Sequence, residues 1–368
     1  MIRIGIVGIG SIAESYISLF SEGKFEGAKI TALTSRNQLR MNSIIEKYTL
    51  EGIKIFEKLE EMLAFGNVDA VIICTPHHLH AEMIEKVLKA GKHVLTDKPL
   101  GMKTSEVNNL VALSLEHPEL KAGVIFNRRS TEIYKKVKEL VESGKLGELR
   151  RAVWQITNLY RTYDYYTSNL WRGSFKTEGG GVLINQAIHQ LDTMLWIIGM
   201  PVKVSAHTVE GFHRPIFTEN DISIHMIYDS GATAEFMAST HEYPGTNRFE
   251  LSYDMGQIIV EDDSKITIRL LEEKEEDFAK RELGQSGRIP FVEYKEVIHE
   301  VPNGEQQERM IQNFISAVLG KEELICPFKE GQNSIKVINA SYLSAWKDKT
   351  ISLDFDPKEY DEALALKK

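Results

Sequence analysis

The chain has 368 residues, more than a single hydrophobic core accommodates, and 42% of them are hydrophobic, enough to fill two cores. Its 44 basic and 53 acidic residues give a net charge of −9 without long blocks of one sign, which argues against binding to nucleic acid or an anionic membrane. With two cysteines, no apolar run near 18 residues and no signal peptide before the first predicted strand, we expect a protein of the reducing cytoplasm.

The amino terminus predicts a dinucleotide-binding turn. A buried strand over residues 2–7 is followed by the run Gly8-Ile9-Gly10-Ser11-Ile12-Ala13 and then by an amphipathic helix. Gly8 permits the tight turn, Gly10 lets the backbone approach a pyrophosphate, and Ala13 lets the helix pack on the strand. The free N–H groups of Ser11 and Ile12 would then hold the phosphates. The alternative is that these small residues reflect close packing alone.

Strands and helices alternate up to about residue 126. Further strands are predicted over residues 29–34, 53–56, 68–74, 92–96 and 122–126, with helical patterns between them. This alternation predicts a parallel, doubly wound α/β sheet. We therefore expect residues 1–126 to form a Rossmann domain that binds NAD(P).

The pattern changes after residue 126. A helix over 131–143 leads into a long strand over 148–160, and short turns at 229–231 and 254–256 join later strands, which implies antiparallel pairing. We expect residues 127–368 to form a second domain for substrate binding and oligomerisation. Its open antiparallel or mixed sheet would carry helices on one face, and these are predicted over 180–199, 306–319 and 331–347.

The end of the second strand bears on the choice of cofactor. An acidic residue there binds the ribose 2′-OH of NAD, whereas a cation and hydroxyls suit the 2′-phosphate of NADP. No Asp or Glu occurs between Lys29 and Ile45, and Ser35 and Arg36 follow the strand. The sequence therefore leans toward NADP, with NAD as the alternative, since Arg36 could instead stack on adenine.

Two later stretches bring polar groups to the carboxyl edge of the predicted parallel sheet. Thr75 and Pro76 follow the fourth strand, where the backbone contacts dinucleotides, although a plain turn has the same composition. Lys98 follows the fifth strand, and Pro99 restricts the backbone around it, unless it is an ordinary solvated lysine. Three nearby histidines lack a partner at a recognised metal-ligand spacing, so no metal is predicted: His77, His78 and His80.

A glycine run, 179–181, precedes the helix that carries a third group of polar residues. On that helix His189 lies four residues after Asn185 and three before Asp192, so we expect all three on one face. Imidazole titrates near neutral pH, which suits His189 to general base or acid catalysis, with a satisfied core histidine as the alternative. Asp192 either orients the ring or anchors the structure. The glycines would keep bulky side chains out of a pocket.

Aromatic and basic side chains crowd residues 160–172, on a predicted loop ahead of the glycine run. Tyr163 and Trp171 can stack on sugar faces, and Arg161 and Arg172 can hold hydroxyl or phosphate oxygens. The same composition suits an interface or packing loop. We interpret the segment as a sugar-binding loop.

In order and spacing these pieces resemble the Gfo/Idh/MocA family of nicotinamide-dependent oxidoreductases, which join a Rossmann domain to an open-faced sheet domain. The resemblance spans nearly the whole chain and rests on the opening turn, Cys74-Thr75-Pro76-His77-His78-Leu79-His80, Asp97-Lys98-Pro99, Asn127-Arg128-Arg129, Trp171-Arg172-Gly173, the glycine run and His189-Gln190-Leu191-Asp192.

The resemblance implies a part for each matching residue. Lys98 would lie beside the nicotinamide and stabilise alkoxide character on the substrate oxygen as hydride leaves. Asn185 stands where many relatives have aspartate, which leaves it a substrate hydrogen bond. Cofactor contacts are also implied for His80, Asp97, Asn127, Trp171 and Arg172. For His80 the alternative is a solvent-facing histidine at a helix start, and Asp97 is shorter than the acidic residue common in the family.

We therefore expect an NAD(P)-dependent dehydrogenase or reductase acting on a secondary alcohol or ketone of a sugar, cyclitol or sugar derivative. Two alternatives stay open: redox-neutral elimination or glycoside cleavage in the same cleft, and a cofactor-sensing protein without turnover. We also expect a homodimer or homotetramer formed through the carboxy-terminal sheet, because an open sheet face would otherwise expose apolar surface.

Overall fold

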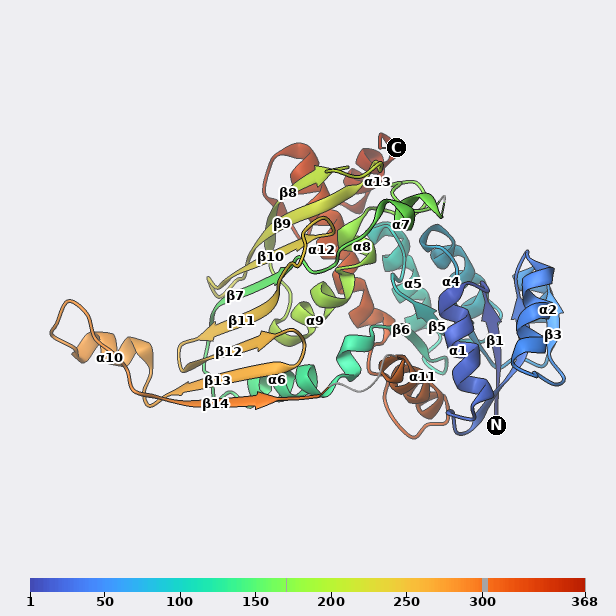
Figure 1. Cartoon of the computed structure of the whole chain (residues 1–368), viewed down its shortest axis with the longest axis horizontal. Helices are drawn as coiled ribbons and strands as arrows, with labels where there is room; N and C mark the ends of the chain where they lie inside the picture. Colours follow the sequence, from blue (N-terminus) through green and yellow to red (C-terminus); the bar gives the residue numbers. More distant parts are fainter. Residues whose placement is uncertain (170, 300–303, 368) are drawn as a thin grey trace. The chain divides into compact units, whose positions relative to one another are not determined.

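The computed structural model describes residues 1–169, 171–299 and 304–367. The chain forms two compact units (Figure 1). The first contains Met1–Ser130, Lys176–Gly179 and Val301–Lys336, and the second contains Thr131–Phe175, Gly180–Glu300 and Val337–Lys368. A single boundary at residue 126 therefore misses the return of a late segment to the first unit.

The first unit is built on a six-stranded parallel sheet with the strand order β3-β2-β1-β4-β5-β6. Its strands are β1 (Ile2–Val7), β2 (Ala28–Thr34), β3 (Lys54–Phe56), β4 (Ala70–Ile73), β5 (His93–Asp97) and β6 (Ala122–Ile125). Its helices include α1 (Ser11–Ser21), α2 (Gln38–Lys47), α3 (Leu59–Ala64), α4 (His80–Lys89) and α5 (Thr104–Glu116). The order reverses between β1 and β4, which confirms the predicted doubly wound sheet and marks where such sheets bind ligands.

A late helix also belongs to the first unit. α11 (Glu305–Val318) contacts α1, β5 and β6, so the prediction that it packs on the second sheet is wrong. Its apolar spacing shows which face is buried but not which sheet receives that face. α12 (Phe328–Lys347) begins in the same unit, where Pro327 bridges to Gly123 of β6, and its second half belongs to the second unit.

The second unit is built on a nine-stranded mixed sheet with the order β14-β13-β12-β11-β7-β10-β9-β8-β15. Its strands are β7 (Leu149–Ile156), β8 (Lys203–Glu210), β9 (Glu219–Ile227), β10 (Thr233–Ser239), β11 (Asn247–Tyr253), β12 (Gly256–Glu261), β13 (Lys265–Leu271), β14 (Phe291–Val297) and β15 (Ile351–Ser352). The turns expected at 229–231 and 254–256 join the antiparallel pairs β9–β10 and β11–β12, as predicted. The neighbours β7 and β10 are parallel.

Helices cover one face of the second sheet. They include α6 (Glu132–Glu142), α8 (Val182–Asn185), α9 (Ile188–Ile198) and α13 (Pro357–Ala365). The short helix α7 (Tyr163–Thr167) follows β7, and α10 (Glu275–Arg281), which has no buried residue, projects beyond the ends of β13 and β14 (Figure 1). Trp154 of β7 is fully buried on the covered face, stacked on Phe249 at 4.1 Å and against Tyr134 of α6 at 5.4 Å between ring centroids. Across the described residues, no helix is both long enough and apolar enough to span a bilayer.

The opposite face of the second sheet is polar. Arg248 donates to Glu250 at 2.9 Å and to Glu261 at 2.7 Å, and Gln257 donates to Glu250 at 2.7 Å. These residues alternate along β11 and β12 with buried apolar ones. On these two strands the open face therefore carries ion pairs where the sequence analysis expected apolar surface, and the oligomeric state stays a prediction.

Candidate functional site

The glycine turn of the first unit has the geometry of a phosphate site. Gly8 has φ +86°, and a Cβ there would lie 2.6 Å from Thr75 Cγ2, so only glycine fits. At Gly10 a Cβ would meet no atom within 4 Å, which leaves open space in front of the turn. Gly10 is the N-cap of α1 and has no side chain to cap it, so the first N–H groups of the helix can face an anion.

A cavity of about 510 Å³ lies along α1 within the first unit. Its lining residues are Ser11, Ile12, Glu14, Ser15, Tyr16, Ser18, Leu19, Tyr48, Gly304 and Gln307. Ser11 and Ile12 are the two residues whose N–H groups are predicted to hold phosphates. The cavity therefore includes the start of α1, and Lys98 is not among its lining residues.

The first turn of α2, shortly after β2, carries a cation that the sequence analysis did not single out. Ser35 is half-buried and Arg36 is exposed, as a site open to a 2′-phosphate requires. Arg40 lies in the first turn of α2, where its Nε donates to the carbonyl of Ile9 at 2.7 Å and its Nη2 to Glu14 at 3.0 Å. Asn37 caps α2 by accepting the Arg40 N–H at 3.0 Å. This N-cap, three residues before Arg40, is the sequence signal that places Arg40 in the first turn of the helix.

His80 ties together the loops that follow β4 and β5. The imidazole is fully buried, with Nε2 2.7 Å from the Thr75 carbonyl and Nδ1 2.6 Å from the Pro99 carbonyl. A carbonyl only accepts, so a neutral ring donates to one of them and a charged ring to both; burial lowers the pKa of His80. The solvent-facing alternative is wrong, because the ring is buried and backbone engages both nitrogens, so the ring positions the two loops. The predicted contact of His80 with the cofactor stays a prediction.

Lys98 lies at the carboxyl end of β5, on one of the loops that His80 holds. Its side chain is half-buried, its N–H donates to Asp97 Oδ1 at 3.0 Å, and the Lys98–Pro99 peptide is cis. Burial raises the pKa of Asp97, while the positive charges of Lys98 and His80 act to lower it. The same surroundings lower the pKa of His77, first through burial and then through the charge of Lys98. The first unit therefore places positive charge beside this edge of its sheet.

The histidines after β4 do not gather around a common point. The buried His77 has Nδ1 2.7 Å from the Glu178 carbonyl, and His78 has Nδ1 3.1 Å from the Thr177 carbonyl. Each ring thus bonds to backbone of the segment just before the glycine run. Asn127 lies further along the same unit, where its Nδ2 donates to Gln306 at 3.2 Å.

The helix predicted over 180–199 is two helices. The N–H of Ala187 bonds to the carbonyl of Val182, five residues earlier, at 2.7 Å, and this interrupts the helical ladder between α8 and α9. Asn185 therefore belongs to α8, whereas His189 and Asp192 belong to α9, and the prediction of one continuous face is wrong. Asp192 is buried and His189 is half-buried at the start of α9.

Tyr165 gathers the polar residues of the second unit, and the sequence reasoning did not single it out. Its hydroxyl accepts from Asn185 Nδ2 at 3.2 Å and from Gln186 Nε2 at 2.8 Å. The guanidinium of Arg172 lies 3.9 Å from the Tyr165 ring centroid and that of Arg161 lies 5.0 Å away. Four predicted or neighbouring side chains thus meet on one phenol, a convergence that pairwise spacing in the sequence does not reveal.

The two arginines have unused donor capacity. The Nε atoms of Arg161 and Arg172 are buried and have no hydrogen-bond partner within the described part of the chain. Arg172 Nη1 donates to the Tyr165 carbonyl at 2.8 Å and Arg161 Nη1 to the Tyr160 carbonyl at 2.9 Å, so both guanidinium groups are held in place. Fixed donors of this kind suit hydroxyl, carboxylate or phosphate oxygens.

The other two predicted loop residues lie toward the surface. Trp171 is half-buried, and the Arg172 guanidinium lies 5.6 Å from its ring centroid. Tyr163 is exposed, and the guanidinium of Arg214 lies over its ring, 5.4 Å from the ring centroid. Arg214 Nε also donates to the Arg161 carbonyl at 2.8 Å, which fixes the start of the loop.

A buried carboxylate holds the start of α8. Glu219 is fully buried and accepts from Gly181 N–H at 2.9 Å, from Leu183 N–H at 3.0 Å and from Tyr342 Oη at 2.8 Å. Burial raises the pKa of Glu219 to about 7, although these donors act to lower it. A Cβ on Gly180 would lie 2.1 Å from Tyr342 Oη, so this glycine permits close packing.

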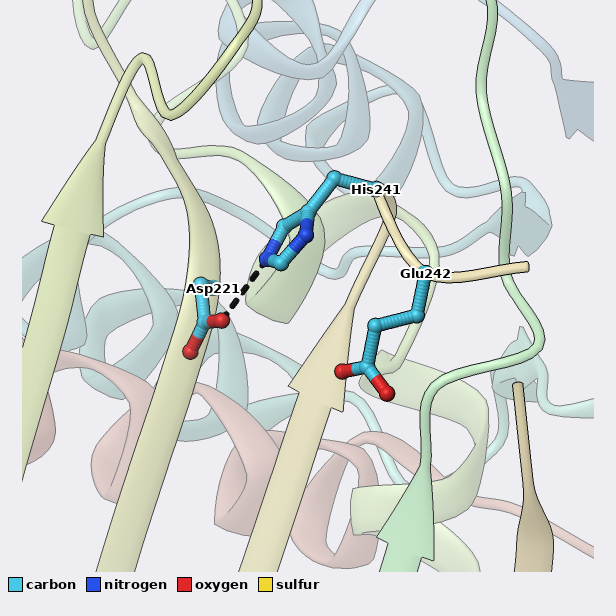
Figure 2. Close-up of side chains that lie close together, drawn as sticks. All are labelled: Asp221, His241 and Glu242. Atoms are coloured by element: carbon cyan, nitrogen blue, oxygen red, sulfur yellow. Dashed lines mark hydrogen bonds and ion pairs between the residues drawn. The ribbon is translucent and has the colours of Figure 1, made fainter. Parts of the chain in front are cut away.

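A second cluster of ionisable residues lies where β9 begins and just after β10 ends. His241 Nε2 lies 2.8 Å from Asp221 Oδ2, and Glu242 points toward the same place (Figure 2). The three ligand-type atoms lie within 4.8 Å of one another, and Glu242 also accepts from Ser239 Oγ at 2.8 Å. No sequence motif singled out this trio. Hydrogen bonds hold His241 to Asp221 and Glu242 to Ser239.

Taken together, the glycine turn at the switch point and the polar cluster of the second unit define a two-domain dinucleotide-binding protein. Comparison with known families makes this specific. Residues 2–123 match the model described as "Oxidoreductase family, NAD-binding Rossmann fold", and residues 134–259 match the GFO/IDH/MocA C-terminal domain. The chain therefore belongs to the Gfo/Idh/MocA oxidoreductase family, which confirms the resemblance seen in its motifs.

Individual relatives are distant. The chain is 28% identical to the uncharacterised oxidoreductase YrbE of Bacillus subtilis over 62% of its own length and 64% of the relative's. It is 29% identical to a myo-inositol 2-dehydrogenase of Thermotoga maritima over 55% of its length and 56% of the relative's. The matched segment thus spans less than two thirds of either relative.

Solved structures share the fold over almost the whole chain. The WlbA dehydrogenase of Bordetella pertussis, in complex with NADH and UDP-GlcNAcA, superposes with a TM-score of 0.79 at 24% identity and covers 96% of this chain and 99% of its own. Levoglucosan dehydrogenase in complex with NADH gives 0.80 at 18% identity, over 96% and 100% of the two chains. At these identities the similarity establishes the fold.

Proposed function

We propose that the protein is an NAD(P)-dependent dehydrogenase or reductase acting on a secondary alcohol or ketone of a sugar, cyclitol or sugar derivative. The observation that carries the proposal is the pairing, within one chain, of a glycine turn built for a pyrophosphate with a fixed lysine on a neighbouring loop of the same sheet edge. The myo-inositol dehydrogenase among its relatives and the sugar complexes among its structural neighbours support the substrate class.

The residues divide the chemistry between them. Bound nicotinamide supplies or accepts the hydride. Lys98 would donate a hydrogen bond to the substrate oxygen and stabilise its negative charge. His189 would take the hydroxyl proton in oxidation and return it in reduction. Asn185, held through the Tyr165 hydroxyl, would orient a neighbouring substrate hydroxyl.

The substrate-facing donors favour a ligand rich in oxygen. Arg161 and Arg172 offer fixed, buried Nε–H groups beside an aromatic ring, an arrangement that suits a carboxylate or phosphate on a sugar. We therefore place acidic sugar derivatives at the head of the substrate class. A panel that pairs each neutral sugar with its uronic acid would measure the preference as a ratio of kcat/KM.

For the cofactor we propose a preference for NADP. The end of β2 has no carboxylate, and Ser35 and Arg36 follow it on a surface-accessible loop. Arg40 adds a positive charge beside the turn, though its donors already engage Ile9 and Glu14. Thermal-shift titrations with NADP and NAD would test this: a lower Kd for NADP that is lost in Arg36→Ala supports the proposal, and a tighter fit of NAD contradicts it.

The decisive test of the activity is Lys98→Ala. We expect the variant to bind nucleotide with unchanged affinity and to lose roughly 10³-fold in kcat once a substrate is identified, because removing one donor to a developing oxyanion costs about that much. Lys92→Ala, at the opposite end of the same strand, is the matched control and should keep full activity.

Three other outcomes of the same assay would reject or redirect the proposal. Undiminished turnover in Lys98→Ala would reject the assigned chemistry. Conversion of a glycoside without net accumulation of reduced cofactor would indicate the redox-neutral cycle. Nucleotide binding with no turnover in either direction, across the whole panel, would indicate a sensing protein.

A further inference from the structure

The outermost strand of the second sheet, β14, is unusually exposed. All seven of its residues are exposed, and it forms an edge of the sheet, with β13 on one side only (Figure 1). Phe291, Val292, Tyr294 and Val297 are 51%, 47%, 55% and 54% exposed. Proteins commonly protect such edges by keeping them short, as with the two-residue β15 at the opposite border. A seven-residue edge with four large apolar side chains is therefore a surface that invites a partner strand.

The pairing with β13 determines which backbone groups of β14 face outward. The pairs Ile298–Ser264 and Pro290–Glu272 at its two ends are hydrogen-bonded, at 2.7 and 3.1 Å. Hydrogen-bonded pairs alternate along an antiparallel ladder, so the even-numbered residues of β14 direct their N–H and C=O groups to β13. The odd-numbered residues direct theirs away from the sheet: Phe291, Glu293, Lys295 and Val297.

We propose that β14 pairs antiparallel with β14 of a second copy of this chain, with the two-fold axis at Tyr294. In that register Glu293 lies opposite Lys295 of the second copy, and Lys295 opposite its Glu293. Phe291 lies opposite Val297, and the two Tyr294 rings meet on the axis. Opposite charges and apolar pairs that face each other directly across two strands stabilise their association. The pairing joins the two sheets and is closed, because it consumes the same edge on both copies.

Charge selects this register over its neighbours. A shift by one residue would set outward-facing backbone groups against inward-facing ones and break the ladder. A shift of the axis to residue 293 would place Glu293 against Glu293, and a shift to 295 would place Lys295 against Lys295. Within one chain Glu293 accepts from Arg269 at 2.8 Å and from Lys295 at 2.7 Å, so the arriving lysine would meet a carboxylate already held in place.

A disulfide across the axis tests the register directly. In the proposed dimer the two copies of residue 294 form a non-hydrogen-bonded pair, in which Cα atoms lie about 4.5 Å apart. Tyr294→Cys should therefore form an intermolecular disulfide under mild oxidation. Val292→Cys is the matched control, because its sulfur would lie roughly 14 Å from its counterpart, four residues along the strand. The native Cys74 and Cys326 are both buried and should not react.

We expect a disulfide-linked dimer on a non-reducing gel for Tyr294→Cys and none for Val292→Cys. Absence of the Tyr294→Cys dimer, or equal cross-linking of the two variants, would overturn the proposal. The result does not depend on catalytic activity, so it stands or falls separately from the proposed function.

Charge reversal provides an independent measurement on the unmodified backbone. Lys295→Glu places glutamate opposite glutamate twice, and Glu293→Lys places lysine opposite lysine twice, so each variant alone should self-associate roughly 10-fold more weakly in sedimentation equilibrium. An equimolar mixture sets unlike charges opposite each other at both pairs and should restore the association. Association of either single variant as tight as that of the wild type, or a mixture no tighter than its components, would contradict the pairing.

Discussion

The candidate site residues of the two units are held in different ways. In the first unit, the groups that are held are backbone groups. The turn at Gly8 packs on Thr75, and His80 bonds to backbone carbonyls of the two loops that carry Thr75 and Lys98. In the second unit, a side chain distant in the sequence holds the site. The Glu219 carboxylate fixes the start of α8 by accepting from Gly181 and Leu183, which lie 38 and 36 residues before it. Each unit therefore depends on one buried ionisable group: burial lowers the pKa of His80 in the first unit and raises that of Glu219 in the second.

The largest expected effect comes from adding a methyl group to the glycine run. A Cβ on Gly181 would lie 1.8 Å from the backbone carbonyl oxygen of Glu219, and backbone cannot move aside as a flexible side chain can. We expect Gly181→Ala to lower the free energy of unfolding of the second unit by roughly 3 kcal/mol or more. All four tryptophans belong to this unit, so urea titration followed by tryptophan fluorescence measures it.

Gly10→Ala is the matched control in the first unit. Its Cβ would meet nothing within 4 Å, so the stability should be unchanged while nucleotide affinity falls, because the methyl group occupies space meant for a pyrophosphate. Equal destabilisation by Gly181→Ala and Gly10→Ala would show that the two units do not differ in how closely their glycines are packed.

The same contrast explains how much could be predicted from the sequence. The Rossmann sheet, its turn and the position of Lys98 follow from local patterns, because a strand, a glycine turn and a helix are neighbours in the chain. The convergence on Tyr165 could not be predicted, because it joins residues about 20 positions apart through a loop of irregular structure. Likewise, the break at Ala187 leaves no Gly or Pro signature at that position, so α8 and α9 were predicted as one helix.

The pH dependence of Glu219 sharpens the comparison. Its folded-state pKa of about 7 lies above its ordinary value of 4.5, so the folded protein holds a proton that the unfolded chain has released. Stability contributed by this group is therefore fully present below pH 4.5 and is lost as the pH rises to about 7. The shift corresponds to about 3 kcal/mol, as an order of magnitude.

Glu219→Gln isolates that contribution. Its amide nitrogen would face a backbone N–H that the carboxylate now accepts, which costs about 1–3 kcal/mol at any pH. At pH 5 the variant should thus be less stable than the wild type, and the gap should shrink or reverse by pH 8. Urea titrations with tryptophan fluorescence at both pH values measure this gap, and a gap that stays constant between pH 5 and pH 8 would show that the carboxylate is ionised throughout.

A smaller effect is expected from His80 in the first unit. His80→Phe keeps the ring volume but removes the N–H that a neutral ring donates to the Thr75 or the Pro99 carbonyl, at a cost of about 2 kcal/mol. The loop that carries Lys98 should loosen, so kcat should fall more than nucleotide affinity. His78→Phe, which removes one exposed contact to Thr177, is the control and should change neither.

The smallest expected effect comes from the Tyr165 hydroxyl. Tyr165→Phe keeps the ring on which Arg161 and Arg172 stack, but it leaves the amides of Asn185 and Gln186 without their shared acceptor. The neighbouring loop is accessible to water, which can replace part of the bond, so we expect a loss of about 1 kcal/mol in substrate binding, seen as a roughly fivefold rise in KM with kcat nearly unchanged. Tyr163→Phe, on the exposed side of the same loop, should have no effect. A fall in kcat with constant KM in Tyr165→Phe would instead place the phenol in the chemical step. The second unit would then supply a proton donor besides His189.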